Sequence, residues 1–226
     1  CVDTEYRAVP GERVKPICLV AREIRTSETQ RRWLWDSDPG APPWDPDDPR
    51  TLIVSYSAPA ECGVFAVLGW RQPVSLVDLW AEYRARTNGL TMKTKFLDAL
   101  ETYGVSAPID ADEKKHKQML CANGTADQIK ANRPGIVDYC EIDMLLLCEL
   151  YARMAPSLDW DAALLRGEYG VACAEIEHRG IPIDVERLAV LVDRWNEVRA
   201  AAASIATTRM RFRIYGGRNE WDTIFV

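Results

Sequence analysis

The amino-acid sequence predicts an α/β protein, in which helices flank a mixed β-sheet and a helical extension follows at the C-terminal end. Short β-rich runs dominate the chain up to Leu79, whereas apolar residues at helical spacing dominate the remainder. This order, with most strands before most helices, is typical of a sheet covered by helices. With 226 residues, 47% of them hydrophobic, the chain can bury the core of one full domain plus a smaller appendage.

Two or three antiparallel strands are expected to open the domain. They cover residues 1–8, 17–24 and 31–35, and a turn at Pro10-Gly11 separates the first two. Residues 36–50 then contain five prolines and five aspartates. This composition predicts an exposed loop and not a fold element.

Helices become dominant beyond this loop. Two further strands are expected at 51–56 and 74–79, with helices at 59–68, 80–87, 92–103 and 126–154. The last of these helices is expected to be interrupted near Pro134-Gly135, because proline breaks the interior of a helix.

The pattern changes after Pro156. An amphipathic helix is expected over 160–178, and a turn at Gly180 leads to a second helix that Asp184 caps and that ends near 203. We therefore divide the chain into domains of residues 1–158 and 159–226. The final stretch, 207–226, has no clear period and receives no assignment.

Composition narrows the class of protein. No run of about 18 residues is apolar enough to cross a bilayer, and the start of the chain lacks the basic-then-apolar order of a signal peptide. We therefore expect a soluble cytoplasmic protein without a membrane partner. The net charge of −6 argues against a broad basic surface for long duplexes, but it permits a small site for a strand end.

Any catalysis is expected to depend on carboxylates. The seven cysteines form no Cys-x-x-Cys pair, so they are expected to be reduced and mostly buried, with no disulfide framework or thiolate zinc site. The two histidines, His116 and His178, leave little for histidine-based metal or Ser-His-Asp chemistry. A basic run at Lys114, Lys115 and Lys117 fits phosphate contacts, although a solvated charge run is the simpler interpretation.

Two pairs of residues carry the chemical signal. Asp3 and Glu5 are alternate residues of the expected first strand, so both carboxylates point to one side and can share a pair of cations. Tyr139 and Asp143 lie at i and i+4 of an expected helix, which places a phenol and a carboxylate on one face. Each pair alone is common by chance, and each also fits a solvated strand face or an ordinary amphipathic helix.

Together, Asp3-Thr4-Glu5 and Tyr139-x-x-x-Asp143 resemble, in order and separation, the motifs of the DEDD family of 3′→5′ exonucleases. The resemblance is to the subclass with a tyrosine in its third motif. The segment Val2-Asp3-Thr4-Glu5 is also similar to the first motif of the proofreading domain in family A DNA polymerases. This resemblance covers about residues 1–155, and it implies an RNase H-like fold and hydrolysis of the terminal phosphodiester of DNA.

The middle motif departs from the family pattern, which usually reads Asn-x-x-x-Asp at the start of a helix. The matching place in this chain holds Ser57 and Glu61, so the carboxylate carries one additional methylene. Because small misplacements of a catalytic group are costly, this departure leaves open a domain that binds without cleaving. Asp78, on the next expected strand, is a reserve candidate, although a structural role is its simpler interpretation.

The resemblance implies a mechanism with two Mg²⁺ or Mn²⁺ ions, which prefer oxygen ligands and act about 3.5–4 Å apart on water and on the departing 3′-oxygen. It assigns Asp3 to both ions, and Glu5 and Asp143 to the ion that activates water. Glu61 would hold the second ion, and Tyr139 would orient the attacking water. The implied substrate is a single-stranded 3′ end of DNA. We expect the first three carboxylates to converge in one cleft, with Glu61 at its rim.

Residues 168–188 carry a second resemblance, to the stretch that links exonuclease and polymerase thumb in family A enzymes. A helical hairpin with a Gly-x-Pro turn is the alternative. The leading hypothesis is therefore a proofreading-type exonuclease module of DNA replication and repair, with a polymerase region or partner protein beside it. Two alternatives are a stand-alone nuclease in repair or defence and a degenerate domain that binds DNA or a partner protein.

Overall fold

The computed structural model of the protein describes residues 1–88, 90, 93–107 and 111–210. These residues form a mixed α/β structure, which confirms the predicted class. They divide into two compact units, Cys1–Gly180 and a second unit that begins at Ile181. The first unit opens with the order β-β-β-β-α-β-α, as the sequence predicted.

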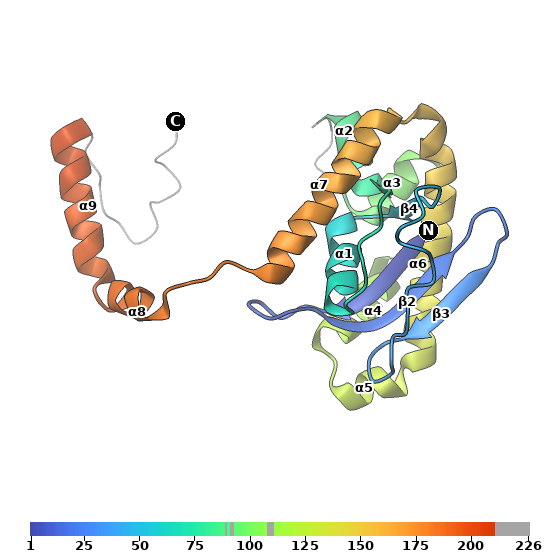
Figure 1. The fold of residues 1–226 in the computed structure, drawn as a ribbon, viewed down its shortest axis with the longest axis horizontal. Helices are drawn as coiled ribbons and strands as arrows, with labels where there is room; N and C mark the ends of the chain where they lie inside the picture. The colour runs from blue at the N-terminus through green and yellow to red at the C-terminus, as the bar shows by residue number, and fades with distance from the viewer. Residues whose placement is uncertain (89, 91–92, 108–110, 211–226) are drawn as a thin grey trace. The chain divides into compact units, whose positions relative to one another are not determined.

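The first three strands form an antiparallel sheet in the order β1-β2-β3 (Figure 1). They are β1 (Val2–Arg7), β2 (Lys15–Arg22) and β3 (Thr29–Trp33). Side chains of β2 alternate between the faces, so Cys18 and Val20 join one core cluster and Leu19 joins another. The register with β1 shifts between Glu5 and Tyr6, and an irregularity of this kind increases the local twist of a strand.

A parallel pair of short strands lies beside this sheet. The pair consists of β4 (Ile53–Ser55) and β5 (Leu76–Asp78), and α1 (Ala58–Val67) lies in the connection between them. Parallel neighbours need such a crossover, because a tight turn reverses the direction of the chain. Every residue of both strands is buried, and β4 also contacts β1.

Helices cover both faces of the antiparallel sheet (Figure 1). On one face, α6 (Arg133–Met154) contacts all three strands, and Met144 packs there with Val20. On the other face, α1 contacts β1 and β2, and Phe65 packs there with Leu19. Outside α1 lies α7 (Trp160–Arg179), which contacts α1 and β5. The sheet is therefore the middle layer of the first unit.

The helical stretch expected over 126–154 is interrupted close to the predicted place. It divides at Asn132 into α5 (Ala126–Ala131) and α6, because Pro134 fits only the first turn of a helix. The sequence did not predict α4 (Ala111–Asn123), whose residues lack a clear apolar period. The other helices of this unit are α2 (Leu79–Thr87), α3 (Phe96–Thr102) and the 3-10 turn Ala155–Ser157. The expected start of α3 at Met92 lies outside the described residues.

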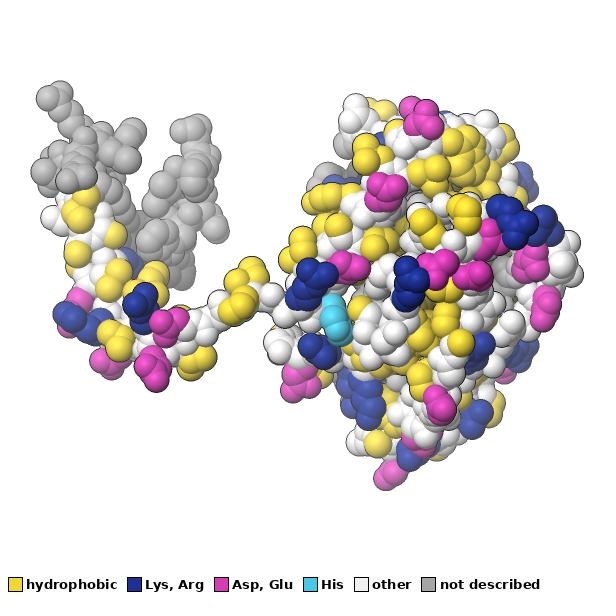
Figure 2. Space-filling view, in the orientation of Figure 1, with side chains coloured by type: hydrophobic (Ala, Val, Ile, Leu, Met, Phe, Trp, Pro, Cys, Tyr) yellow, Lys and Arg dark blue, Asp and Glu magenta, His cyan; other side chains and the backbone are white. Residues whose placement is uncertain are grey.

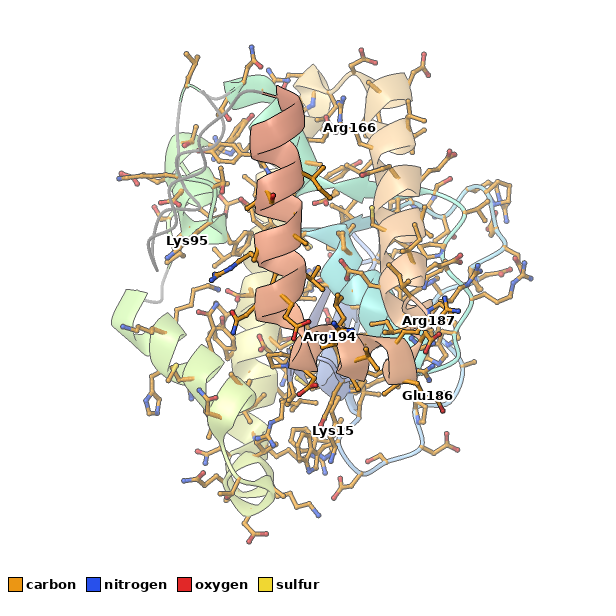
Figure 3. All side chains as sticks on the ribbon, turned by 90° about the vertical axis from the view of Figure 1, so that its left-hand side faces the viewer. Lys15, Lys95, Arg166, Glu186, Arg187 and Arg194 are labelled. Carbon is orange, nitrogen blue, oxygen red and sulfur yellow. The ribbon has the colours of Figure 1, made fainter. Side chains whose placement is uncertain are left out.

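The first compact unit extends past residue 158, where the sequence placed a domain boundary. It includes α7 because the packing is close: a Cβ atom on Gly167 would lie 1.9 Å from the carbonyl oxygen of Leu76. Arg166 (Figure 3) also donates hydrogen bonds of 2.6 and 2.8 Å to the buried carboxylate of Glu82 on α2. The change of pattern after Pro156 therefore marks a change of direction between two helices of the same unit.

Residues 36–50 have no regular secondary structure, as predicted, but they are more than an exposed loop. The ring centroid of Trp44 lies 5.0 Å from that of Phe65 and 5.9 Å from that of Trp70. The Trp70 indole in turn donates a 2.7 Å hydrogen bond to the carbonyl oxygen of Gly40. This aromatic contact fastens the loop to α1.

The second unit contains α8 (Val185–Asp193) and α9 (Trp195–Met210), which meet at Arg194 (Figure 3). Asp184 caps α8 as predicted, because its carboxylate accepts a 3.0 Å hydrogen bond from the backbone N–H of Arg187. The single helix expected to end near 203 is therefore two helices. Of the unassigned stretch 207–226, the part beyond 210 lies outside the described residues.

The surface of the first unit carries charges of both signs. On the face in Figure 2, basic and acidic side chains are interspersed. In the described part of the chain, no helix has the length and apolar character needed to cross a membrane.

Candidate functional site

A cavity of about 400 Å³ lies in the first unit, and β1, the start of α1, α4 and α6 contribute side chains to it. Four acidic residues line it: Asp3, Glu5, Glu61 and Asp143. They come from three different elements, a strand and two helices on opposite faces of the sheet. The layered fold therefore brings into one cavity residues that are up to 140 positions apart in the chain.

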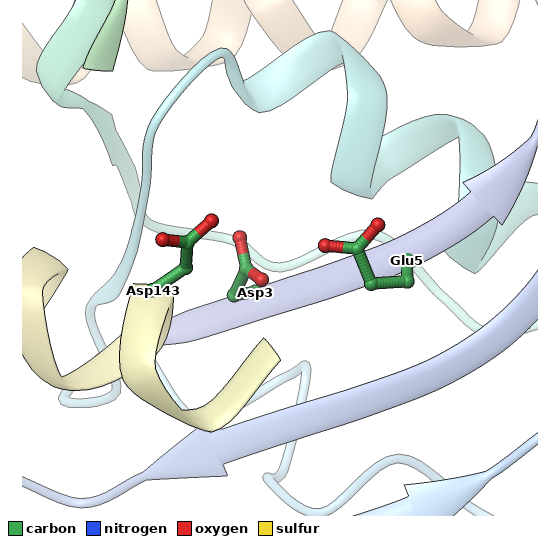
Figure 4. Close-up of side chains that lie close together, drawn as sticks. All are labelled: Asp3, Glu5 and Asp143. Atoms are coloured by element: carbon green, nitrogen blue, oxygen red, sulfur yellow. The ribbon is translucent and has the colours of Figure 1, made fainter. Parts of the chain in front are cut away.

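The carboxylates of Asp3, Glu5 and Asp143 converge, as the sequence predicted. Three carboxylate oxygens, one from each residue, all lie within 4.8 Å of one another. Figure 4 shows the three carboxylates side by side along β1, with Asp3 in the middle. Asp3 and Glu5 share a side because they are alternate residues of a strand, and α6 crosses that strand closely enough to add Asp143.

Tyr139 lines the cavity one helical turn before Asp143, so the predicted shared face of α6 is also confirmed. The tyrosine is only 2% exposed. Burial raises the pKa of its hydroxyl, and the charge of Asp143 raises it further. The phenol therefore stays protonated and can donate a hydrogen bond inside the cavity.

Glu61 lines the same cavity but lies deeper than expected. It is 4% exposed and stands in the wall, not at the rim. Ser57, which precedes the helix, has a φ of 75°, in the left-handed region that serine seldom adopts. This turn sets the direction in which α1 leaves β4. The first helical turn, with Glu61, is thereby directed into the interior.

Three carboxylate oxygens of the site are buried without a hydrogen-bond partner: Asp3 Oδ2, Glu61 Oε2 and Asp143 Oδ1. Leaving one buried acceptor unpaired costs about 1–3 kcal/mol, and more when it is charged. Folded proteins normally satisfy such groups with hydrogen bonds or with a metal ion. Because carboxylate oxygens are hard ligands, these residues fit a divalent cation such as Mg²⁺ or Mn²⁺.

Burial and crowding favour the protonated forms of Asp3, Glu5 and Glu61. Burial, and next the charge of Asp143, raise the pKa of Asp3 to about 7. Burial also raises the pKa of Glu5 and of Glu61 well above the ordinary value, and the charge of Asp3 adds to each shift. The site therefore resists full ionisation until a cation compensates its charge.

In a chelating buffer, we expect the free energy of unfolding to fall as the pH rises from about 5 to 8. Asp3 keeps its proton up to about pH 7 in the folded protein, whereas its ordinary pKa is 3.8. Between these values the folded state holds more protons than the unfolded state, so raising the pH favours unfolding. Glu5 and Glu61 shift in the same direction and add to the effect. Urea titrations at the two pH values measure the difference.

Excess Mg²⁺ or Mn²⁺ should remove most of this decrease, because a bound cation favours the ionised carboxylates. The variant Asp3→Asn has no titrating group at that position and should show a smaller decrease. Wild-type stability in chelator that is equal or higher at the upper pH would contradict the prediction.

Lys114, which the sequence indicated only as one member of a basic run, lines the site. Its ammonium forms an ion pair with Asp143, and the residue is 8% exposed. Lys115, its neighbour, is exposed, so the basic run is a solvated surface only in part. The helical spacing of Lys114, Gln118 and Cys121, all of which line the cavity, is the signal that distinguishes Lys114 from the rest of the run.

Asp78, the reserve candidate, has a structural role. Its carboxylate accepts a 2.8 Å hydrogen bond from the backbone N–H of Ser57 and one of 2.9 Å from that of Trp80, which caps α2. Asp78 therefore fixes the left-handed turn before α1, and it does not line the cavity.

Comparison of the chain with protein-family models, with curated proteins and with solved structures finds no match. The interpretation of the cavity therefore rests on the geometry and chemistry of its own residues.

Proposed function

We propose that the cavity is the active site of a 3′→5′ exonuclease, which hydrolyses the terminal phosphodiester at a single-stranded 3′ end of DNA with Mg²⁺ or Mn²⁺ as cofactor. The observation that carries the proposal is the convergence of Asp3, Glu5 and Asp143 in one cavity with buried, unpartnered carboxylate oxygens. Bound cations reverse the charge of such a site, so that it attracts a phosphate.

We infer that the first unit has an RNase H-like arrangement. Three features support this inference: the antiparallel order β1-β2-β3, the parallel pair β4-β5 that contacts β1, and the helices on both faces. In this arrangement β1 receives side chains from α1 on one side and from α6 on the other. A strand that carries two carboxylates can therefore gain a third and a fourth.

Hydrolysis joins the oxygen of a water molecule to phosphorus and breaks the bond between phosphorus and the 3′-oxygen. The water gives up one proton, the departing 3′-oxygen takes one up, and a nucleoside 5′-monophosphate leaves. Two divalent ions, when bound, lower the pKa of the attacking water and neutralise charge on the phosphate and the departing oxygen.

The residues of this chain hold and orient the reactants. Asp3, Glu5 and Asp143 present their convergent oxygens as ligands, and Glu61 adds a fourth carboxylate from the wall. The hydroxyl of Tyr139, which lines the same cavity and stays protonated, would orient the attacking water.

A single-stranded oligonucleotide labelled at its 5′ end tests the proposal. With Mg²⁺ or Mn²⁺ we expect a ladder of products shortened from the 3′ end, together with nucleoside 5′-monophosphates. An RNA strand and a blunt duplex of the same sequence measure the preference for single-stranded DNA. Cleavage that persists in excess EDTA would exclude this mechanism. A wild-type protein that is inert with both ions would favour the degenerate binding domain.

Replacing Glu61 with glutamine should reduce the digestion rate about 100-fold or more, a loss comparable to that from misplacing a catalytic group. The amide keeps the size of the side chain but removes the charge that a cation requires. Because burial already favours the neutral form of Glu61 in the metal-free protein, a neutral amide at this position should not lower its stability. The measurement is the initial rate of single-strand digestion at saturating Mn²⁺.

Glu101→Gln, on the exposed side of α3, is the matched control and should change stability by less than about 0.5 kcal/mol without affecting the rate. Glu61→Asp keeps the charge and withdraws it by roughly one C–C bond. An unchanged rate for Glu61→Gln would show that Glu61 is not a ligand. If the wild type is inert and Glu61→Asp cleaves DNA, the natural domain has lost its activity through the longer side chain.

We infer a proofreading-type module as the setting of this activity, with a polymerase region as its partner. The inference is supported by the sequence resemblance of residues 168–188 to the exonuclease–thumb link, and α7 and α8 are the helices in that stretch. A stand-alone nuclease shares the same chemistry.

A further inference from the structure

The described side chains that line the cavity include one cation, the ammonium of Lys114. It is paired with Asp143, and its Nζ lies 5.0 Å from the ring centroid of Tyr139 and 5.3 Å from that of Phe96. The ammonium is therefore held between a carboxylate and two aromatic rings. Such contacts compensate a buried lysine for the water that it has lost.

The position of Lys114 is fixed by the fold, because α4 forms a wall of the cavity. Lys114, Gln118 and Cys121 line the cavity at spacings of four and three residues, which places them on one face of the helix. The same helix contacts β1 and α6, the two elements that carry the convergent carboxylates.

Once its four carboxylates are ionised, the cavity needs bound cations to balance their charge. Four carboxylates face one ammonium, and three of the carboxylates each have an unpartnered buried oxygen. Two divalent cations would balance all four, and the ammonium at Asp143 would then be surplus positive charge. An anionic phosphate in the same cavity is the group that compensates it, through a charge-assisted hydrogen bond.

We propose that Lys114 is a phosphate-binding residue. Its ammonium pairs with Asp143 in the metal-free protein and with a non-bridging oxygen of the terminal phosphate once the carboxylates hold divalent ions. The flexible stem of lysine permits this exchange of partners, while the rings of Phe96 and Tyr139 keep the ammonium at the cavity. The inference rests on the proposed exonuclease function and adds a substrate contact outside its carboxylates and tyrosine.

Calorimetry tests the inference through two binding steps, first of Mn²⁺ alone and then of dTMP at saturating Mn²⁺. The nucleotide carries the phosphate that hydrolysis would release, so the measurement requires no cleavage. Lys114→Met removes the charge but keeps the apolar stem between the rings, and Lys114→Arg keeps the charge. Lys115→Met, on the exposed side of α4, is the matched control.

Lys114→Met should weaken dTMP binding about 10-fold or more. It should bind Mn²⁺ at least as tightly as the wild type, because the competing ammonium is gone. Lys114→Arg should retain dTMP affinity within about threefold, and Lys115→Met within about twofold. Unchanged dTMP affinity in Lys114→Met would overturn the inference, since Lys114 would then be a counterion alone. Loss of Mn²⁺ binding in the same variant would also overturn it, because Lys114 would then support the carboxylates structurally.

The wild-type protein separates this inference from the proposed function. If it binds Mn²⁺ and digests DNA while Lys114→Met keeps its dTMP affinity, the exonuclease proposal stands and the role of Lys114 falls. If the wild type binds Mn²⁺ but not dTMP, the phosphate contact falls and the metal site stands. If it binds no Mn²⁺, both fall.

Discussion

Replacing Asp3 with asparagine should abolish digestion, with a loss of rate of about 1,000-fold or more, which corresponds to about 4 kcal/mol in activation free energy. Asp3 lies between Glu5 and Asp143 in the row of carboxylates (Figure 4), so it is the residue best placed to contact both ions. Asparagine preserves the size of the side chain but removes the charge and one acceptor oxygen. Initial rates of single-strand digestion at saturating Mn²⁺ measure the loss.

The same substitution should stabilise the metal-free protein at pH 8 by on the order of 1 kcal/mol. Burial and the charge of Asp143 raise the pKa of Asp3 to about 7, so ionising Asp3 at this pH opposes folding. A variant that is inactive and also less stable would indicate a damaged fold, not a lost ligand. Asp138→Asn is the control on α6: Asp138 is exposed and pairs with Arg31 at the surface, so its loss should change neither rate nor stability appreciably.

The local geometry of the site followed from the sequence because it depends on short periods. Alternation along a strand placed Asp3 and Glu5 on one side, and the helical turn placed Tyr139 beside Asp143. Neither period states that the strand and the helix face each other across a cavity. That expectation came from the resemblance to a family, and the convergence of the carboxylates confirms it.

The features that the sequence did not predict depend on contacts between distant segments. Lys114 sits on a helix without an apolar period, and its burial results from the approach of α4 to β1 and α6. The depth of Glu61 depends on the left-handed turn at Ser57, which the carboxylate of Asp78 fixes from another strand. Trp44 packs on Phe65 although it lies in a run of prolines and aspartates, whose composition indicates an exposed loop. Composition reports none of these contacts.

The domain boundary expected at residue 158 also depended on the local pattern of the sequence, which does not report contacts between distant segments. The chain turns at the 3-10 segment Ala155–Ser157, and the pattern of apolar residues changes there. The packing of α7 on α1 and β5 nevertheless keeps it in the first unit. The residue that permits this packing is a single glycine of α7, because only a residue without a Cβ atom lets a helix approach a strand backbone this closely.

Replacing that glycine, Gly167, with alanine should destabilise the first unit by about 3 kcal/mol or more. The added Cβ atom would lie 1.9 Å from the carbonyl oxygen of Leu76 and 2.8 Å from its carbonyl carbon. These atoms belong to the backbone of β5, so rotation of a side chain cannot relieve the overlap and α7 must move. In a protein of this length, such a loss lowers the melting temperature by about 6–12 °C, which calorimetry or circular dichroism measures.

Gly170 provides the matched control on the same helix. A Cβ atom there would lie 3.6 Å from that of Ala58, an ordinary contact, and alanine is favoured over glycine inside a helix by about 0.5–1 kcal/mol. Gly170→Ala should therefore stabilise the protein, and effects of equal sign for the two variants would contradict the packing of α7. Because α7 supports α1, and α1 carries Glu61, Gly167→Ala should also slow digestion by the molecules that remain folded, whereas Gly170→Ala should not.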